Sequence, residues 1–279
     1  MTSPRTPSGA LPRLRRRAVM SVDRAVRSRF ATLATRNPVV ADPATERAAI
    51  NAFTALWDPT SGEPPSDGVR DAIVERFHQL YYGATDRTWR GSTTYRGTTI
   101  WKCPLDLWLY QELLAEVRPG LVIETGTAYG GSAFYLGDLC ETLGLGKVVT
   151  IDTQVFEGRV THPRVTYLFG SSTSEDVLEQ VRAMVPTDAP VLVILDSDHT
   201  RDHVLGELRA LSPLVPVGSC VIVEDTNVNG HPTYPSFGPG PMEALDAFLA
   251  ENDDFVVDPI SEKFFMTFNP RGVLRRVRS

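Results

Sequence analysis

The stretch that decides the fold runs from Leu121 to Ser132 and reads L-V-I-E-T-G-T-A-Y-G-G-S. Three apolar residues lead into an acid and then into a turn with glycines at positions 126, 130 and 131. A buried strand that ends in a glycine-rich turn and opens a helix is typical of nucleotide-binding α/β proteins. The dinucleotide pattern G-x-G-x-x-G would need glycine at position 128, where alanine stands, so a dinucleotide site is not indicated. An ordinary strand–turn–helix is the alternative interpretation.

The composition of the 279-residue chain is that of a soluble globular protein, with 42% hydrophobic and 22% charged residues. No apolar run approaches the roughly 20 residues of a membrane span, so no membrane partner is expected. The three cysteines are widely spaced and form no C-x-x-C motif, which argues against a zinc site and a disulfide framework. Their usage favours a cytoplasmic location.

The net charge of -6 is unevenly distributed. Residues 1–36 hold nine arginines and one acid, so the remaining chain is strongly acidic, and an acidic body argues against nucleic acid as a partner. We interpret residues 1–36 as a basic, flexible tail, with an RNA- or membrane-contacting arm or a transit peptide as alternatives. The oligomeric state stays open, and this tail is a candidate for contacts between copies of the chain.

Residues 37–118 are predicted to form a helical extension or lid. Apolar residues recur at helical spacing over 69–82 and over 105–117, and a further helix is expected at 46–57.

Residues 119–279 are predicted to form the catalytic domain, because strands alternate there with helices, the pattern of a mostly parallel sheet with helices on both faces. The expected strands are 121–124, 147–152, 165–169, 191–196 and 220–225, and the expected helices are 132–143, 174–184, 203–214 and 241–250. Segments 255–257 and 264–268 are expected to add an antiparallel hairpin, which makes seven strands.

Polar residues follow every predicted parallel strand, and such strand ends meet at one edge of the sheet, where ligands bind. Asp196, Glu224 and Asp225 offer hard oxygen ligands of the kind that Mg²⁺ or Mn²⁺ prefers. Neighbouring strand residues point to opposite faces, so Glu224 and Asp225 can share a metal only where the strand is ending. The alternative is that one is a ligand and the other caps or pairs; Asp198 is a further candidate ligand.

His199 lies three residues after Asp196, on the turn that opens the next helix. Histidine titrates near neutral pH, so His199 can take a proton from a bound hydroxyl, with a purely structural role as the alternative. His203, one helical turn later, is expected to support the site or to be exposed.

The glycine turn and Asp152 are candidate cofactor contacts. Asp152 lies 26 residues beyond Gly126 and can accept both hydroxyls of a ribose, with a helix cap as the alternative role. Gly126 and Gly130 allow the backbone to approach a cofactor. Ser132 can cap its helix or bind a cofactor.

The loop at 226–241 is rich in proline, glycine and asparagine, and it is long enough to be functional. Because it begins at the candidate metal acids, it is predicted to cover the acceptor site. His231 and Tyr234 in this loop, together with Trp101, are candidate substrate contacts.

These segments together resemble the cephalosporin hydroxylase family and its relatives, the metal-dependent sugar O-methyltransferases of macrolide and rhamnose-bearing antibiotic pathways. The resemblance covers roughly residues 88–270. It rests on W-K-x-P-x-D at 101–106, E-T-G-T-x-x-G-G-S-A at 124–133, L-D-S-D-H-T at 195–200 and V-E-D-T-N-V-N-G-H-P at 223–232.

The resemblance implies a Rossmann-like class I methyltransferase fold that binds S-adenosylmethionine, with Asp196, Glu224 and Asp225 as ligands of Mg²⁺ or Mn²⁺ and His199 as the catalytic base. The cofactor contacts that it implies, together with the residues of the glycine turn, are Glu124, Gly126, Thr127, Gly130, Ser132, Asp152, Ser172 and Asp196.

The expected activity is O-methylation of a hydroxyl on a sugar or antibiotic intermediate, a small glycosylated or polyhydroxyl molecule. A hydroxylase or a hydroxylase partner is the main alternative. Oxygen activation would normally need Fe(II) on two histidines and a carboxylate, and only His199 and His203 are close in sequence to the acids. A non-catalytic cofactor-binding subunit is the third possibility.

Overall fold

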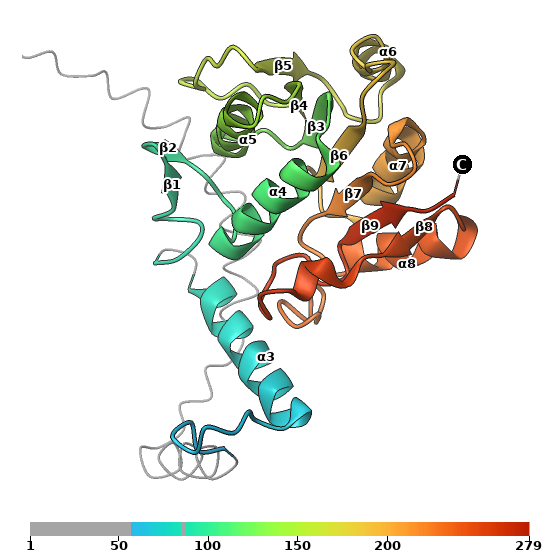
Figure 1. Cartoon of the computed structure of the whole chain (residues 1–279). Coiled ribbons are helices and arrows are strands. Elements are labelled where there is room, and N and C mark those ends of the chain that lie inside the picture. Colours follow the sequence, from blue (N-terminus) through green and yellow to red (C-terminus); the bar gives the residue numbers. More distant parts are fainter. Residues whose placement is uncertain (1–56, 85–86, 279) are drawn as a thin grey trace, which may run out of the picture. The chain divides into compact units, whose positions relative to one another are not determined.

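A seven-stranded sheet forms the centre of the computed structural model, which describes residues 57–84 and 87–278. The strand order is β5-β4-β3-β6-β7-β9-β8 (Figure 1). The strands are β3 (Leu121–Thr125), β4 (Lys147–Asp152), β5 (Val165–Phe169), β6 (Val191–Leu195), β7 (Cys220–Val223), β8 (Phe255–Val257) and β9 (Val273–Arg276). The basic tail at 1–36 and almost all of the helix expected at 46–57 lie outside the described residues.

The helices agree closely with the periodicity in the sequence. They are α3 (Asp67–Gly83), α4 (Pro104–Val117), α5 (Gly131–Thr142), α6 (Glu175–Arg182), α7 (Arg201–Leu211) and α8 (Pro241–Glu251), with short 3₁₀ helices η1 (Ser212–Leu214) and η2 (Pro259–Glu262). A small antiparallel pair, β1 (Thr94–Tyr95) and β2 (Thr98–Thr99), precedes α4. None of the helices among the described residues is both long and apolar enough to cross a membrane.

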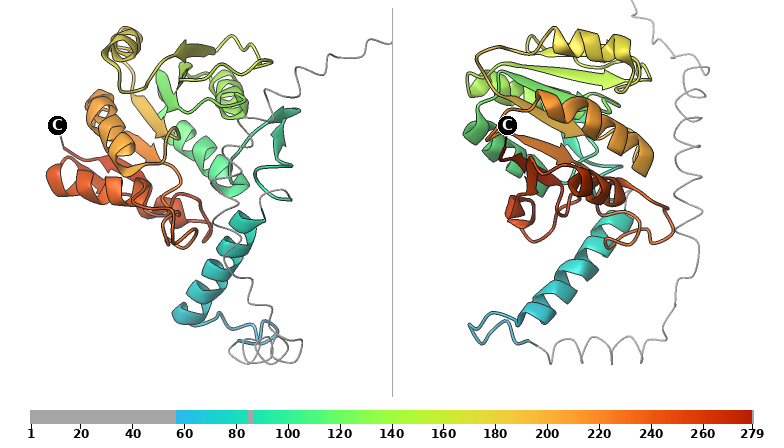
Figure 2. Two further views of the ribbon diagram at one scale, coloured as in Figure 1. Left: turned by 180° about the vertical axis from the view of Figure 1, so that it is seen from behind. Right: turned by 90° about the vertical axis from the view of Figure 1, so that its right-hand side faces the viewer.

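Alternate side chains of the parallel strands pack on opposite faces of the sheet. Ile123, Val149 and Val193 contribute to an apolar cluster with α6, α7 and α8. Val122 and Leu192 contribute to a second cluster with α4 and α5. The two groups of helices therefore cover opposite faces, as Figure 2 shows, and the predicted Rossmann-like α/β fold is confirmed. The predicted boundary between extension and catalytic domain at residue 118 stays a prediction, although α4 packs in the same cluster as the sheet.

The prediction that 264–268 forms the last strand is wrong. The chain instead turns through this segment, and Val273–Arg276 pairs antiparallel with both β7 and β8. Met266 and Phe268 pack in a third apolar cluster with Tyr82 of α3. The backbone N–H of Phe268 donates to Asp106 of α4 at 2.9 Å, so it is not available to a sheet.

Candidate functional site

The glycine turn after β3 is packed against the residues that follow β6. Gly126 has a φ of +87°, which favours glycine, and an added Cβ would lie 1.7 Å from the backbone oxygen of Asp196. The N–H of Gly126 donates to the Ile151 oxygen at 2.8 Å. Glycine is therefore required first for protein packing, because it lets the turn after β6 lie beside the turn after β3. Gly130, with a φ of +82°, is the N-cap of α5.

Two predicted cofactor residues support this turn from inside the protein. Glu124 is fully buried and accepts a hydrogen bond from the Thr150 hydroxyl at 2.6 Å. The Thr127 hydroxyl is 2.6 Å from the same Thr150 hydroxyl. Burial raises the pKa of Glu124, against the opposing charge of Lys102. Ser132 is buried in the first turn of α5.

Asp152, at the end of β4, joins the glycine turn to the next loop. Its Oδ2 accepts from the Ala128 N–H at 2.8 Å and from Arg159 at 3.0 Å. Its Oδ1 accepts from the Gln154 N–H at 2.8 Å. Arg159 also donates to the Ala128 oxygen at 2.8 Å, so one arginine lies across the acid and the turn.

Asp196, His199 and Asp225 come together at the carboxyl edge of the sheet, with one potential ligand atom from each within 4.8 Å of the others. His199 Nε2 is 3.1 Å from Asp225 Oδ2 and 3.8 Å from Asp196 Oδ1. The chain turns away from the strand direction at Asp225, which has a φ of +53° and whose N–H donates to Asn269 at 3.0 Å. Asp198 is exposed and accepts from the Thr200 N–H, outside this group.

Lys102 is buried beside this group and contacts two of the predicted metal ligands. Its Nζ is 2.5 Å from Asp196 Oδ2 and also donates to Glu224 Oε1. Burial raises the pKa of Asp196 to about 7 and that of Glu224 to about 8. Burial alone would lower the pKa of Lys102, but the two carboxylates raise it. Lys102 therefore stays charged, and Glu224 faces it; that Glu224 binds a metal stays a prediction.

Tyr82 of α3 reaches the same acids from the N-terminal side of the chain. Its hydroxyl donates to Asp225 Oδ1 at 3.0 Å. The ring is buried, stacks on Trp89 at 4.9 Å and meets Phe268 edge-on at 4.7 Å. Burial raises the pKa of Tyr82, so the hydroxyl keeps its proton and remains a donor to the carboxylate.

The three predicted substrate residues lie in different surroundings. His231 pairs with Glu243 at 3.0 Å and lines a cavity of about 530 Å³ beside α3. Tyr234 meets Tyr82 edge-on at 5.3 Å. Trp101 instead meets Tyr129 of the glycine turn at 5.2 Å. The structure therefore places His231 and Tyr234 beside α3, and Trp101 beside the turn.

Lys102 and Tyr82 are not among the site residues predicted from the sequence. Lys102 carried a signal, since it is one of three lysines in an arginine-rich chain and stands in the W-K-x-P-x-D motif. Tyr82 carried none beyond the helical periodicity of α3.

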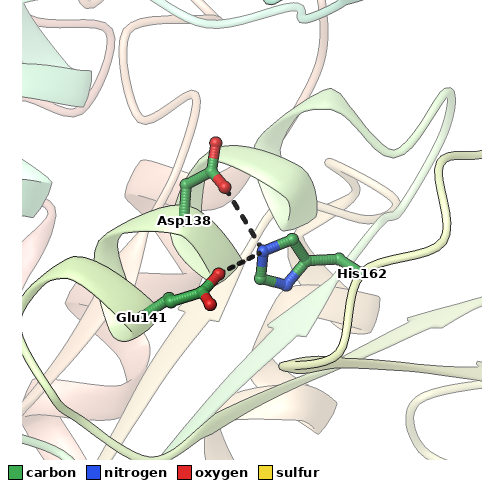
Figure 3. A group of neighbouring side chains, drawn as sticks. All are labelled: Asp138, Glu141 and His162. Carbon is green, nitrogen blue, oxygen red and sulfur yellow. Dashed lines mark ion pairs between the residues drawn. The ribbon is translucent and has the colours of Figure 1, made fainter.

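A second group of possible ligands, formed by Asp138, Glu141 and His162, lies between α5 and the loop that precedes β5 (Figure 3). His162 Nε2 is 3.3 Å from Asp138 and 3.4 Å from Glu141. His162 Nδ1 accepts from the Arg164 N–H at 3.1 Å, so the proton of the neutral ring is on Nε2. A metal would need Nε2 without its proton, so this arrangement favours hydrogen bonding of the Nε2–H to the two acids. The missing Cβ of Gly137 leaves room for the His162 ring.

Comparison with known proteins identifies the family of the chain. The family described as Rhamnosyl O-methyltransferase/CmcI matches residues 87–277. Rhamnosyl O-methyltransferase of Mycobacterium tuberculosis (strain ATCC 25618 / H37Rv) is 42% identical over 214 residues, which are 74% of this chain and 86% of the relative. The Mycobacterium leprae (strain TN) protein of the same name is 38% identical over 213 residues, which are 74% of this chain and 91% of the relative.

Solved structures of CmcI share the fold. An apo structure has a TM-score of 0.54 and 26% identity, and the match covers 67% of this chain and 77% of that one. A structure described as Mg-SAM has a TM-score of 0.52 and 26% identity, with 66% and 76% covered. The family model spans most of the described residues and the relatives match over most of their own length. This chain belongs to the Rhamnosyl O-methyltransferase/CmcI family.

Proposed function

We propose that this chain transfers the methyl group of S-adenosylmethionine to a hydroxyl of a sugar substituent, with Mg²⁺ at the carboxyl edge of the sheet. Family membership makes the chain an S-adenosylmethionine-dependent O-methyltransferase. The observation that carries the proposal is the group of Asp196, His199 and Asp225 beside the glycine turn.

The donor set fits a divalent cation. Asp196 and Asp225 supply hard oxygen atoms, and Glu224 adjoins them through Lys102. The raised pKa values of Asp196 and Glu224 indicate that Lys102 alone does not offset the buried negative charge. Bound Mg²⁺ would supply the missing positive charge and lower the pKa of an acceptor hydroxyl.

His199 is proposed to take the proton of the acceptor hydroxyl at Nε2, the nitrogen that faces the two acids. Once Nε2 carries this proton, the Asp225 carboxylate, 3.1 Å away, stabilises the resulting imidazolium. Tyr82 in turn fixes the other oxygen of Asp225. The hydroxyl oxygen then attacks the methyl carbon, and the sulfonium leaves as a neutral thioether.

Asp152 is proposed to bind the ribose of the cofactor. A carboxylate offers about four acceptor positions, and three donors already use this one. One ribose hydroxyl can therefore bind the remaining acceptor position of Asp152 directly. The second ribose hydroxyl can bind the position that Arg159 occupies once Arg159 moves away. The buried Glu124 and Ser132 behind the glycine turn are proposed to bind the amino-acid end of S-adenosylmethionine.

The acceptor is proposed to be a deoxysugar carried by a natural product, since the curated relatives are rhamnosyl O-methyltransferases. The hydroxylase alternative fits less well. Among the described residues, the group at the strand ends has one histidine and two acids, whereas His203 faces Glu207.

Calorimetric titration with S-adenosylmethionine tests the cofactor, and methyl transfer to rhamnosides, with Mg²⁺ or with EDTA, tests the reaction. We expect micromolar binding, and transfer that needs Mg²⁺. Transfer that is equally fast in EDTA would contradict the metal assignment. An absence of binding in both conditions would contradict the proposed function.

A further inference from the structure

Glu207 of α7 is a fully buried carboxylate that the reaction outlined above does not use. Its Oε1 accepts from the Ser172 hydroxyl at 2.5 Å and from the Ser197 hydroxyl at 2.7 Å. His203 Nε2, one helical turn earlier, lies 3.3 Å from the same oxygen. Its Oε2 makes no hydrogen bond within residues 57–84 and 87–278. One acid thus collects donors from three segments of the chain.

Two of those segments are walls of the proposed cofactor site. Ser172 lies in the turn after β5. Gly170, in the same turn, donates its N–H to the backbone oxygen of Asp152 at 3.0 Å. Ser197 follows β6, and its Cα would be 3.0 Å from a Cβ on Gly126. The first turn therefore adjoins the acid proposed for the ribose, and the second adjoins the glycine turn.

The sheet order places these two turns on opposite sides of the cofactor strands. β4 and β3 lie between β5 and β6, so the turns after β5 and β6 flank the ends of the two strands that carry Asp152 and the glycine turn. Both turns nevertheless meet at a single oxygen of Glu207. Under the proposed function, the base of a cofactor whose ribose binds Asp152 is placed next to this junction.

We propose, on the basis of the proposed function, that Glu207 is a positioning residue that holds the turns after β5 and β6 together around the base of S-adenosylmethionine. Burial removes water as a competitor for the serine hydroxyls, so the two hydrogen bonds to the carboxylate fix the separation of the turns. His203 supplies the third donor and a side chain that is 26% exposed. Glu207 itself is too buried to contact the cofactor, and it acts through these neighbours.

The test compares Glu207→Gln with the wild-type chain and with Glu251→Gln, which removes an exposed carboxylate of α8 that pairs with Arg209 of α7. Calorimetry measures the Kd of S-adenosylhomocysteine and of adenosine, and steady-state assays measure KM for S-adenosylmethionine and kcat. We expect Glu207→Gln to raise both Kd values and this KM about tenfold, with kcat within about twofold of wild type. Glu251→Gln should match the wild type.

Ser197→Ala provides a second route that keeps the buried acid and removes one donor. It should also weaken adenosine binding. Combining it with Glu207→Gln should cost less than the two changes added, because one removes and the other weakens the same Ser197–Glu207 hydrogen bond. Unchanged affinity for adenosine in a folded Glu207→Gln variant, or a fall of kcat with KM unchanged, would overturn the positioning role of Glu207. Either result would leave the proposed function intact. A wild-type chain that binds no S-adenosylmethionine would overturn both.

Discussion

Lys102→Met should strongly destabilise the protein, because Lys102 is the buried cation between Asp196 and Glu224. The Lys102 side chain is 4% exposed, so solvent screens these contacts little. Removing one partner from a buried ion pair costs roughly 3–5 kcal/mol. For a chain of this size that loss corresponds to a fall in Tm of roughly 6–20 °C.

The stability lost in Lys102→Met should increase as the pH rises. Burial raises the folded-state pKa of Glu224 from 4.5 to about 8, so the stability that its protonation contributes is present below about pH 4.5 and is lost as the pH rises through about 8. Without Lys102 this pKa rises further, and folded Lys102→Met retains protons that the wild type releases. The difference in Tm should therefore widen between pH 6 and pH 9.

Thermal unfolding of the two proteins in EDTA, followed by a titration with Mg²⁺, checks the reasoning. Mg²⁺ should raise the Tm of Lys102→Met more than that of the wild type, because the ion replaces the missing charge. Lys147→Met, which removes an exposed lysine at the start of β4, is the matched control and should unfold like the wild type. Equal Tm values for Lys102→Met and the wild type, or a difference that narrows toward pH 9, would refute the neutralising role of Lys102.

Three further predictions concern the residues around the candidate metal group. His199→Ala should lower turnover at least about a hundredfold and keep cofactor affinity, because it removes the proposed base; full activity in the methyl-transfer assay would exclude that role. Tyr82→Phe should weaken Mn²⁺ binding about tenfold with cofactor affinity unchanged, because Asp225 loses its donor, and titration followed by electron paramagnetic resonance measures this. Burial lowers the pKa of His78 from 6.5 to about 4, so the stability that neutral His78 contributes is present above pH 6.5 and is lost as the pH falls toward 4. Urea unfolding should show that the free energy of unfolding falls by about 2 kcal/mol from pH 7.5 to pH 5, and that His78→Gln reduces this fall. An equal fall in both proteins would contradict an origin in His78.

The inner parallel strands β3, β4, β6 and β7 could be predicted from the sequence because their burial on both faces leaves nearly continuous apolar runs. The last strand could not, for a physical reason. β9 reads V-L-R-R, and its arginines are neutralised by acids distant in sequence: Arg275 pairs with Asp258 and Arg276 with Asp254. The segment at 264–268 is more apolar and therefore resembles a strand, but its Phe268 packs in the aromatic cluster with α3.

The acids of the candidate site were predictable because parallel topology brings strand ends to one edge, whatever the helices do. Lys102 and Tyr82 come from segments that precede the sheet, and their approach to Asp196 and Asp225 depends on tertiary contacts over 94 and 143 residues of sequence. No local pattern encodes such a contact.

Composition nevertheless offers a physical reason for lysine at position 102. Arginine carries nearly all the positive charge of this chain, and arginines serve its exposed and half-buried ion pairs. The planar guanidinium is suited to bidentate pairing with one carboxylate, whereas an ammonium is a compact point charge with three donors that can serve separate acceptors. Lys102 contacts two carboxylates from the ends of different strands, Asp196 after β6 and Glu224 after β7. A rare lysine at that junction therefore leaves room on the remaining oxygens, Asp196 Oδ1 among them, for the divalent cation that the proposed reaction requires.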